Sequence, residues 1–91
     1  MFRVVWSERA LNELAEIWMR SETSQRQALT RASHAADQRL RDDPFGSSES
    51  REGDVRVMFE APMGFTFKVD QDAGTVLVGH VWYYAPPRRR S

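Results

Sequence analysis

The stretch ESREGDVRVMFEAPMGFTFKVDQDAGTVLVGHVWYY, residues 49–84, decides the fold of this chain. It contains three runs, at residues 55–60, 65–70 and 75–84, that are rich in Val, Phe, Thr, Trp and Tyr. These residue types favour the pleated, half-buried surface of a sheet. Short segments with Pro and Gly separate the runs and are typical of turns. The stretch therefore predicts a three-stranded antiparallel meander.

The preceding half of the chain predicts one strand and two helices. The strand is the apolar run FRVVW near the N-terminus, and the helices extend over about residues 8–20 and 25–42. Ser7 is a good N-cap for the first helix. Ser24 and Gln27 have the S-x-x-Q spacing of a capping box for the second. The expected apolar stripe of the first helix is Leu11, Leu14, Ala15 and Trp18, widened by Ala10 and Ile17. That of the second is Leu29, Ala32, Ala36 and Leu40.

These elements predict an α+β domain of order β-α-α-β-β-β over residues 1–84. A helical hairpin packs on one face of a small, mainly antiparallel four-stranded sheet, with the first strand beside the last. Residues 43–53 form a polar loop between the second helix and the meander. Residues 85–91 form a basic C-terminal tail that includes Arg88–Arg90.

Alternation along the meander predicts which residues face the helices and which face away. Val57, Phe59, Phe65 and Phe67 are expected in the core. The opposite, open face is expected to carry several apolar side chains, which would form a surface too apolar to stay uncovered. A partner helix or strand is therefore expected there. The residues of this expected surface are Met58, Thr66, Val76, Val78 and Trp82.

Composition excludes several classes of protein. The 13 basic and 13 acidic residues cancel, which argues against a strong non-specific nucleic-acid binder. The absence of cysteine excludes disulfides and thiolate metal sites and suits a reducing cytoplasm. No apolar run is long enough to span a bilayer. We expect a cytoplasmic protein that makes no membrane contact.

No standard motif for a cofactor or a metal is present. There is no glycine-rich phosphate loop and no H-E-x-x-H, and the chain has only two histidines, His34 and His80. His34 lies opposite the apolar stripe of its helix and is expected to be a surface residue. We expect neither a metal nor a cofactor.

One set of residues has the chemistry that RNA cleavage requires. Cleavage through the 2′-hydroxyl needs a base, an acid and cations that stabilise the pentavalent phosphate. His80 or Tyr83 could transfer protons, and Arg56 and other cations could hold phosphate. The competing interpretation is structural: Arg56 and Lys68 form ion pairs on a solvated sheet face, and His80 is a core residue.

The chain resembles the RelE/ParE superfamily of bacterial toxins over nearly its whole length. WSERALNELAEIW, residues 6–18, resembles the family's passage from first strand to first helix, and DDPF resembles the exit from the second helix. SREGDVRVMFEAPMGFTFKVDQDAGTVLVGHVW, residues 50–82, is similar to the R-x-G…R-x-x-F…F-x-V core of the group.

The resemblance implies the toxin of a type II toxin–antitoxin pair, as in plasmid stabilisation, neutralised by a cognate antitoxin. RelE-like members are endoribonucleases that cleave mRNA on the ribosome, whereas ParE-like members bind DNA gyrase. Thr66 and Trp82 stand where RelE-like enzymes often carry arginines, so both mechanisms, and an inactive toxin-fold module, stay open. For catalysis the resemblance points to Arg56, His80 and Tyr83. The chemistry of the residues adds Arg51 and Lys68 for phosphate binding, and the expected open face adds Met58, Thr66 and Trp82 for antitoxin binding.

Overall fold

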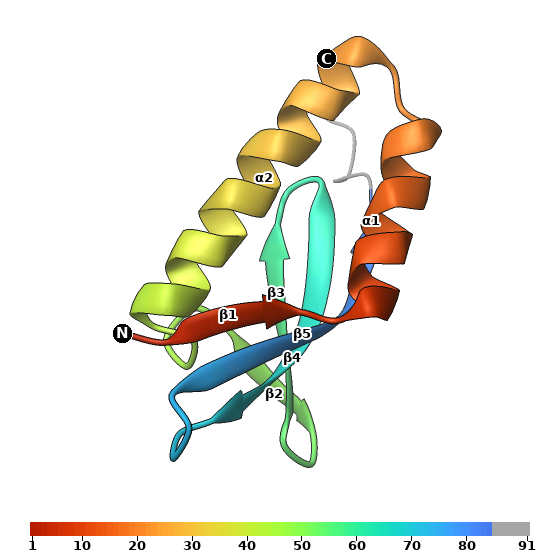
Figure 1. The fold of residues 1–91 in the computed structure, drawn as a ribbon. Coiled ribbons are helices and arrows are strands. Elements are labelled where there is room, and N and C mark those ends of the chain that lie inside the picture. The colour runs from red at the N-terminus through yellow and green to blue at the C-terminus, as the bar shows by residue number, and fades with distance from the viewer. Residues whose placement is uncertain (85–91) are drawn as a thin grey trace, which may run out of the picture.

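The computed structural model describes residues 1–84, and the tail expected at residues 85–91 lies outside the described residues. Two helices and five strands follow one another along this part of the chain (Figure 1). Their order confirms the predicted α+β class, with one strand more than expected. The elements are β1 (Arg3–Trp6), α1 (Glu8–Met19), α2 (Thr23–Asp42), β2 (Glu49–Glu52), β3 (Val55–Glu60), β4 (Met63–Asp70) and β5 (Thr75–Tyr83).

The strands form a single mixed sheet in the order β1-β5-β4-β3-β2. β1 pairs in parallel with β5, as predicted, and the other neighbours are antiparallel. The additional strand β2 lies inside the expected loop and pairs with β3 through a tight turn at Gly53, whose φ of 60° suits glycine. The sequence ESRE of β2 is exposed throughout, so it carries no apolar alternation that would have predicted a strand.

The two helices form the predicted antiparallel hairpin and lie on one face of the sheet (Figure 1). Ser7 caps α1 as expected, because its Oγ accepts a hydrogen bond from the Ala10 N–H at 3.0 Å. α2 begins two residues earlier than predicted. Its N-cap is Glu22, and the side chain of Gln25, not Gln27, accepts the Glu22 N–H at 2.9 Å.

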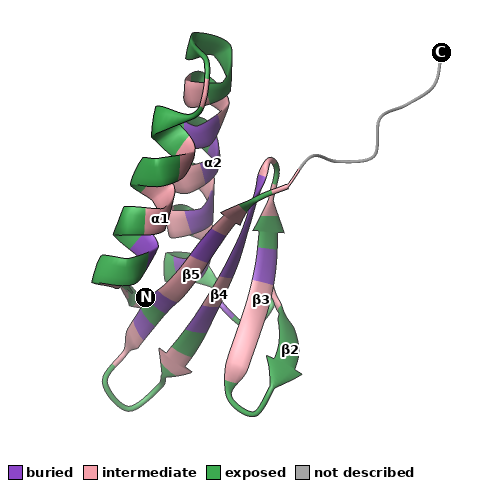
Figure 2. Cartoon of the chain, turned by 90° about the vertical axis from the view of Figure 1, so that its right-hand side faces the viewer, coloured by how far each residue is buried: buried purple, intermediate pink, exposed green. Residues whose placement is uncertain are grey.

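The core lies between α2 and the sheet, and Figure 2 shows the buried residues gathered there. The predicted stripe of α2 is buried in full, as are Phe65 and Phe67. The predicted face of β3 was wrong. Met58, opposite Phe65 in the β3–β4 register, is buried, and Phe59 is 50% exposed. Side chains of directly opposed residues share a face, so Phe65 places Met58 in the core. Met58 is therefore not on the open face.

The buried face of α1 is centred on the edge of the predicted stripe that Ala10 and Ile17 form. Ala10 is buried and Leu14 and Ile17 pack against the core, whereas Leu11 is 51% and Trp18 40% exposed. Positions 10, 14 and 17 follow the same i, i+4, i+7 spacing as the expected stripe. The small side chain of Ala10 lets the first turn of α1 approach β5 closely.

Candidate functional site

A β-bulge in β5 decides which side chains reach the open face. Thr66 on β4 is opposite His80, but the next residue, Phe67, is opposite Val78, so Gly79 is an extra residue in β5. The bulge reverses the alternation of β5. Val76 and Val78 before it, and Val81 after it, are therefore buried in the core. Strict alternation would have placed His80 on the same face as Val76 and Val78. The expected open-face positions of these two valines were thus wrong.

A second bulge lies in β2. Ser50 pairs with Arg56 and Glu52 with Val55, which leaves Arg51 as the extra residue. Bulges often redirect a side chain at a functional site. Arg51 and His80, each at or beside a bulge, line one shallow pocket of about 520 Å³ that crosses the sheet from β2 to β5. Its lining is Glu13, Arg51, Glu52, Val55, Thr66, His80, Val81 and Trp82.

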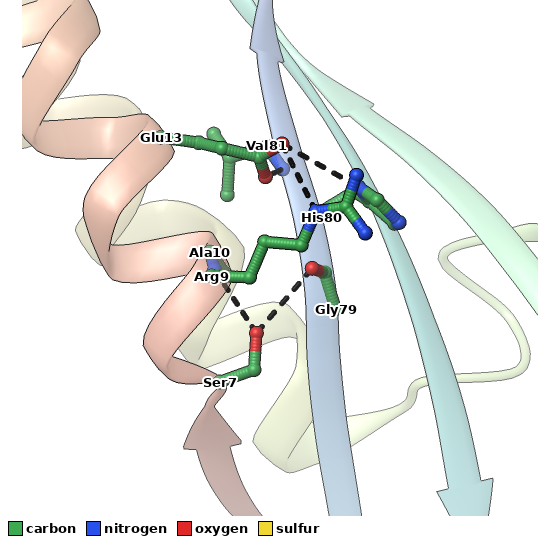
Figure 3. A network of polar contacts seen from close by, with 7 residues as sticks. All are labelled: Ser7, Arg9, Ala10, Glu13, Gly79, His80 and Val81. Carbon is green, nitrogen blue, oxygen red and sulfur yellow. Dashed lines mark hydrogen bonds and ion pairs between the residues drawn. The ribbon is translucent and has the colours of Figure 1, made fainter.

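Glu13 of α1 connects the first helix to His80 (Figure 3). Its Oε1 accepts a hydrogen bond from the Val81 N–H at 2.9 Å, and its Oε2 lies 3.5 Å from Nδ1 of His80. Arg9, one turn earlier in α1, approaches the same Oε2 to 3.8 Å through its Nε. Ser7 adds a further link, because its hydroxyl donates to the Gly79 carbonyl at 3.3 Å. The side chain of His80 is 44% exposed and faces the pocket.

The structure brings together four of the residues expected at a site. Arg51, Thr66, His80 and Trp82 line the same pocket. Lys68 also lies on the open face, but it lines a different pocket near the β4–β5 turn, where its Nζ is 3.8 Å from Asp54.

Tyr83 is not part of the pocket that contains His80. Because side chains alternate regularly beyond the bulge, Tyr83 lies on the same face as Val81, at the end of a groove between α1 and β5. Tyr83 is 43% exposed there, beside Ile17 and Arg20.

Arg56 lies on the helix face of the sheet, opposite the face that carries His80. Its Nε donates to Ser48 Oγ at 2.7 Å, and one of its terminal nitrogens, Nη2, donates to the Ser48 carbonyl at 3.1 Å. Its guanidinium also covers the Phe45 ring, 5.2 Å from the centroid. Arg56 therefore fastens the segment between α2 and β2 to β3, and the structure does not bring it near His80.

Two residues of the pocket region, Arg9 and Glu13, were not expected from the sequence. They form an i, i+4 pair on α1, a common feature of exposed helix surfaces, so their spacing suggested no further role. Glu13 and Val81 are separated by 68 positions in the chain. Only the packing of α1 on β5 brings them together, and nothing local signals it.

An aromatic cluster borders the pocket. Phe59 makes edge-to-face contacts with Trp82 and Tyr84, at centroid distances of 6.1 and 5.4 Å. Trp82 lies over Gly64, where an added Cβ would come within 2.4 Å of the indole. The cluster therefore forms an apolar area on the open face that is partly exposed to solvent.

The pocket holds the groups that proton transfer next to a phosphate requires. It combines an imidazole paired with a carboxylate, a hydroxyl at Thr66 and a cation at Arg51. Within residues 1–84 no group of three or more His, Asp or Glu side chains gathers in a way that would hold a metal ion. No helix in the described part of the chain is long and apolar enough to cross a membrane.

The fold is that of the RelE, ParE and YoeB toxins of type II toxin–antitoxin systems, which the chain matches over nearly its whole length. Among solved structures it is similar to a chain of the toxin–antitoxin complex RelBE2 from Mycobacterium tuberculosis. That match has a TM-score of 0.75 and 16% identity, and it covers 93% of each chain.

Two further structures show the same likeness. The chromosomal ParDE toxin–antitoxin system from P. aeruginosa matches with a TM-score of 0.70 and 13% identity, over 93% of this chain and 98% of that one. The isolated RelE toxin of E. coli matches with a TM-score of 0.63 and 17% identity, over 96% and 88%. No protein-family model and no curated protein sequence matches the chain. The likeness therefore lies in the fold.

Proposed function

We propose that this chain is the toxin of a type II toxin–antitoxin pair and that it cleaves mRNA on the ribosome. The fold supports the first part of this proposal. The observation that carries the second part is the placement of His80, which is paired with Glu13 and open to a pocket that also contains Arg51. A partly exposed histidine that a carboxylate orients is a common arrangement for a general base.

The proposed reaction is transesterification at a phosphodiester of mRNA. His80 takes the proton of the 2′-hydroxyl, and the 2′-oxygen forms a bond to phosphorus. The bond from phosphorus to the 5′-oxygen breaks, and that oxygen takes a proton from water. The products are a 2′,3′-cyclic phosphate and a 5′-hydroxyl. Arg51, and Arg9 at the edge of the pocket, would stabilise the charge on the phosphate.

The open face also supports a protein partner, the cognate antitoxin. Phe59, Leu77 and Val5 are exposed on it, and the half-buried Trp82 and Tyr84 contact Phe59. An apolar area of this kind commonly marks an interface. We assign the antitoxin contact to Thr66, Trp82 and Phe59, with Phe59 in place of the buried Met58. Several of the similar solved structures are toxin–antitoxin complexes.

A second function, non-enzymatic inhibition of DNA gyrase, is supported by the scarcity of cations around His80. Arg56 lies on the other face and Lys68 lines a different pocket, so Arg51 is the only arginine or lysine that lines the pocket itself among the described residues. Strong ribonuclease activity usually needs several cations near the phosphate. A toxin fold kept as an inactive interaction module would have the same feature.

Expression in a bacterial host distinguishes these functions. We expect growth arrest that co-expression of the cognate antitoxin relieves, with new mRNA 5′ ends in phase with codons. Intact mRNA together with an SOS response would favour gyrase inhibition. Normal growth at a verified level of folded protein would contradict the toxin function itself.

A further inference from the structure

The two carboxylate oxygens of Glu13 contact two different groups of β5. Oε1 accepts the backbone N–H of Val81 at 2.9 Å, and Oε2 faces Nδ1 of His80 at 3.5 Å. The side chain is 31% exposed, so it is neither a freely rotating surface group nor a buried one. The Val81 contact therefore limits where Oε2 can point.

The Val81 contact exists because β1 is shorter than β5. β1 ends at Trp6, which is opposite Val78, so the edge of β5 has no strand partner beyond that residue. α1 covers this edge, and Glu13 supplies the acceptor that a neighbouring strand would otherwise provide. A backbone amide in a sheet has a fixed position, so its hydrogen bond restrains the Glu13 carboxylate.

We propose that Glu13 is a positioning residue that holds His80 with its proton on Nδ1 and leaves Nε2 free toward the pocket. In a neutral imidazole one nitrogen donates and the other accepts, and the hydrogen bond at one fixes the role of the other. A carboxylate can only accept, so the 3.5 Å approach of Oε2 favours the proton on Nδ1, where a small movement would make a hydrogen bond. Nε2 is then the base that takes the 2′-hydroxyl proton. The catalytic part of this inference rests on the function proposed above.

The other charged groups near His80 do not supply a competing acceptor at Nδ1. Arg9 on α1 and Arg51 on β2 are donors only, and Glu52 on β2 lines the same pocket without a contact to the imidazole. Thr66, opposite His80 on β4, is uncharged. Glu13 is the single carboxylate within ion-pair distance of His80 in the described part of the chain.

The substitution Glu13→Gln separates this role from a purely structural one. The amide oxygen of glutamine can still accept the Val81 N–H, so the link between α1 and β5 is kept. The amide NH₂ then faces Nδ1 and donates to it, which forces the imidazole proton onto Nε2. Neutral His80 would thus change tautomer while the fold stays intact. Glu16→Gln on the same helix is the matched control, because Glu16 lines the groove beside Tyr83 and not the His80 pocket.

Long-range ¹H–¹⁵N NMR of the folded protein, recorded above pH 8, reads the tautomer directly, and His34 serves as the internal reference. The spectrum of His34→Asn retains only the ring signals of His80 and so assigns the signals of both histidines. We expect the Nδ1–H form for His80 in the wild type and in Glu16→Gln, and the Nε2–H form in Glu13→Gln. An Nε2–H form in the wild type, or the same tautomer in wild type and Glu13→Gln, would overturn the proposal.

Cleavage of ribosome-bound mRNA supplies the second measurement. We expect Glu13→Gln to lower the cleavage rate constant by about a hundredfold, with a thermal midpoint within about 3 °C of the wild type, while Glu16→Gln cleaves normally. Cleavage by Glu13→Gln at the wild-type rate would overturn the catalytic role. No cleavage by the wild type, with the Nδ1–H tautomer present, would instead refute the ribonuclease function and leave the orientation of His80 by Glu13 standing.

Discussion

Arg56 and His80 carry the chemistry most often associated with RNA cleavage, but the structure gives them different surroundings. The guanidinium of Arg56 is engaged with Ser48 and Phe45 on the helix face. The imidazole of His80 is partly exposed on the open face. At the scale of single residues, the two side chains therefore differ in what their removal should change.

Replacement of Arg56 by alanine is expected to affect stability. The hydrogen bonds to Ser48 come from a charged donor, so their loss should lower the free energy of unfolding by about 1–3 kcal/mol. Chemical denaturation measures this. His80→Ala is the comparison and should cost less stability, because its side chain is 44% exposed and its one ion pair, with Glu13, is itself partly exposed. Unchanged stability in Arg56→Ala, together with loss of mRNA cleavage, would indicate that Arg56 acts in the reaction and not in the fold.

The indole of Trp82 leaves no room for a side chain at position 64. In Gly64→Ala the new methyl group would approach the ring to 2.4 Å, so Trp82 must move. We expect a loss of about 1–3 kcal/mol of stability, which is typical of overpacking, and a shifted Trp82 indole N–H signal. Gly79→Ala is the matched control, because nothing lies within 4 Å of the Cβ position there. Equal stability of the two variants would contradict the close packing of Trp82 on Gly64.

At the scale of elements, the bulge at Gly79 controls the composition of the open face. Deletion of Gly79 would restore strict alternation and turn either the segment 76–78 or the segment 80–82 to the wrong face. We expect the deletion variant to lose cooperative unfolding in a circular-dichroism melt, whereas Gly79→Ala melts normally. A deletion variant with the wild-type melting curve would show that the bulge is dispensable.

The elements also show which features the sequence determines. The meander was predictable because apolar alternation and turn residues agree at residues 55–83. β2 was not, because a polar edge strand has no such pattern. Gly79 within an apolar run was a signal for the bulge, since an isolated glycine in a strand often marks one. Without the bulge, alternation assigned Val76, Val78 and His80 to one face.

The candidate site was only partly predictable. His80 and Arg51 were chosen by residue type, Thr66 and Trp82 by strand alternation as part of the open face, and the structure places all four at one pocket. Glu13 was not chosen, because its contact with Val81 depends on how α1 packs across the free edge of β5. Contacts of this kind arise from tertiary packing and leave no local pattern in the sequence.

In the molecule as a whole, helices cover one face of the sheet and leave the other open (Figure 2). The open face carries exposed apolar side chains such as Phe59 and Leu77. We expect the cognate antitoxin to cover the open face. Phe59→Ser should weaken antitoxin binding at least about tenfold, because Phe59 is a large exposed aromatic side chain at the centre of the cluster. Isothermal titration calorimetry measures the affinity.

The matched control for this prediction is Leu11→Ser. Leu11 is as exposed as Phe59, at 51% against 50%, but it lies on α1, away from the open face. We expect its substitution to leave the affinity within about twofold. Loss of affinity in Leu11→Ser but not in Phe59→Ser would place the antitoxin on the helices.

Residues, elements and whole fold together support the proposal that a bulged strand of a toxin fold presents an oriented histidine to mRNA. Purified protein incubated with ribosomes that carry a defined mRNA tests it, with primer extension to map the cuts. We predict cleavage of ribosome-bound mRNA by the wild type, none of the same mRNA without ribosomes, and at least about a hundredfold less with folded His80→Ala. Intact mRNA with the wild type, or equal cleavage by His80→Ala, would contradict the claim.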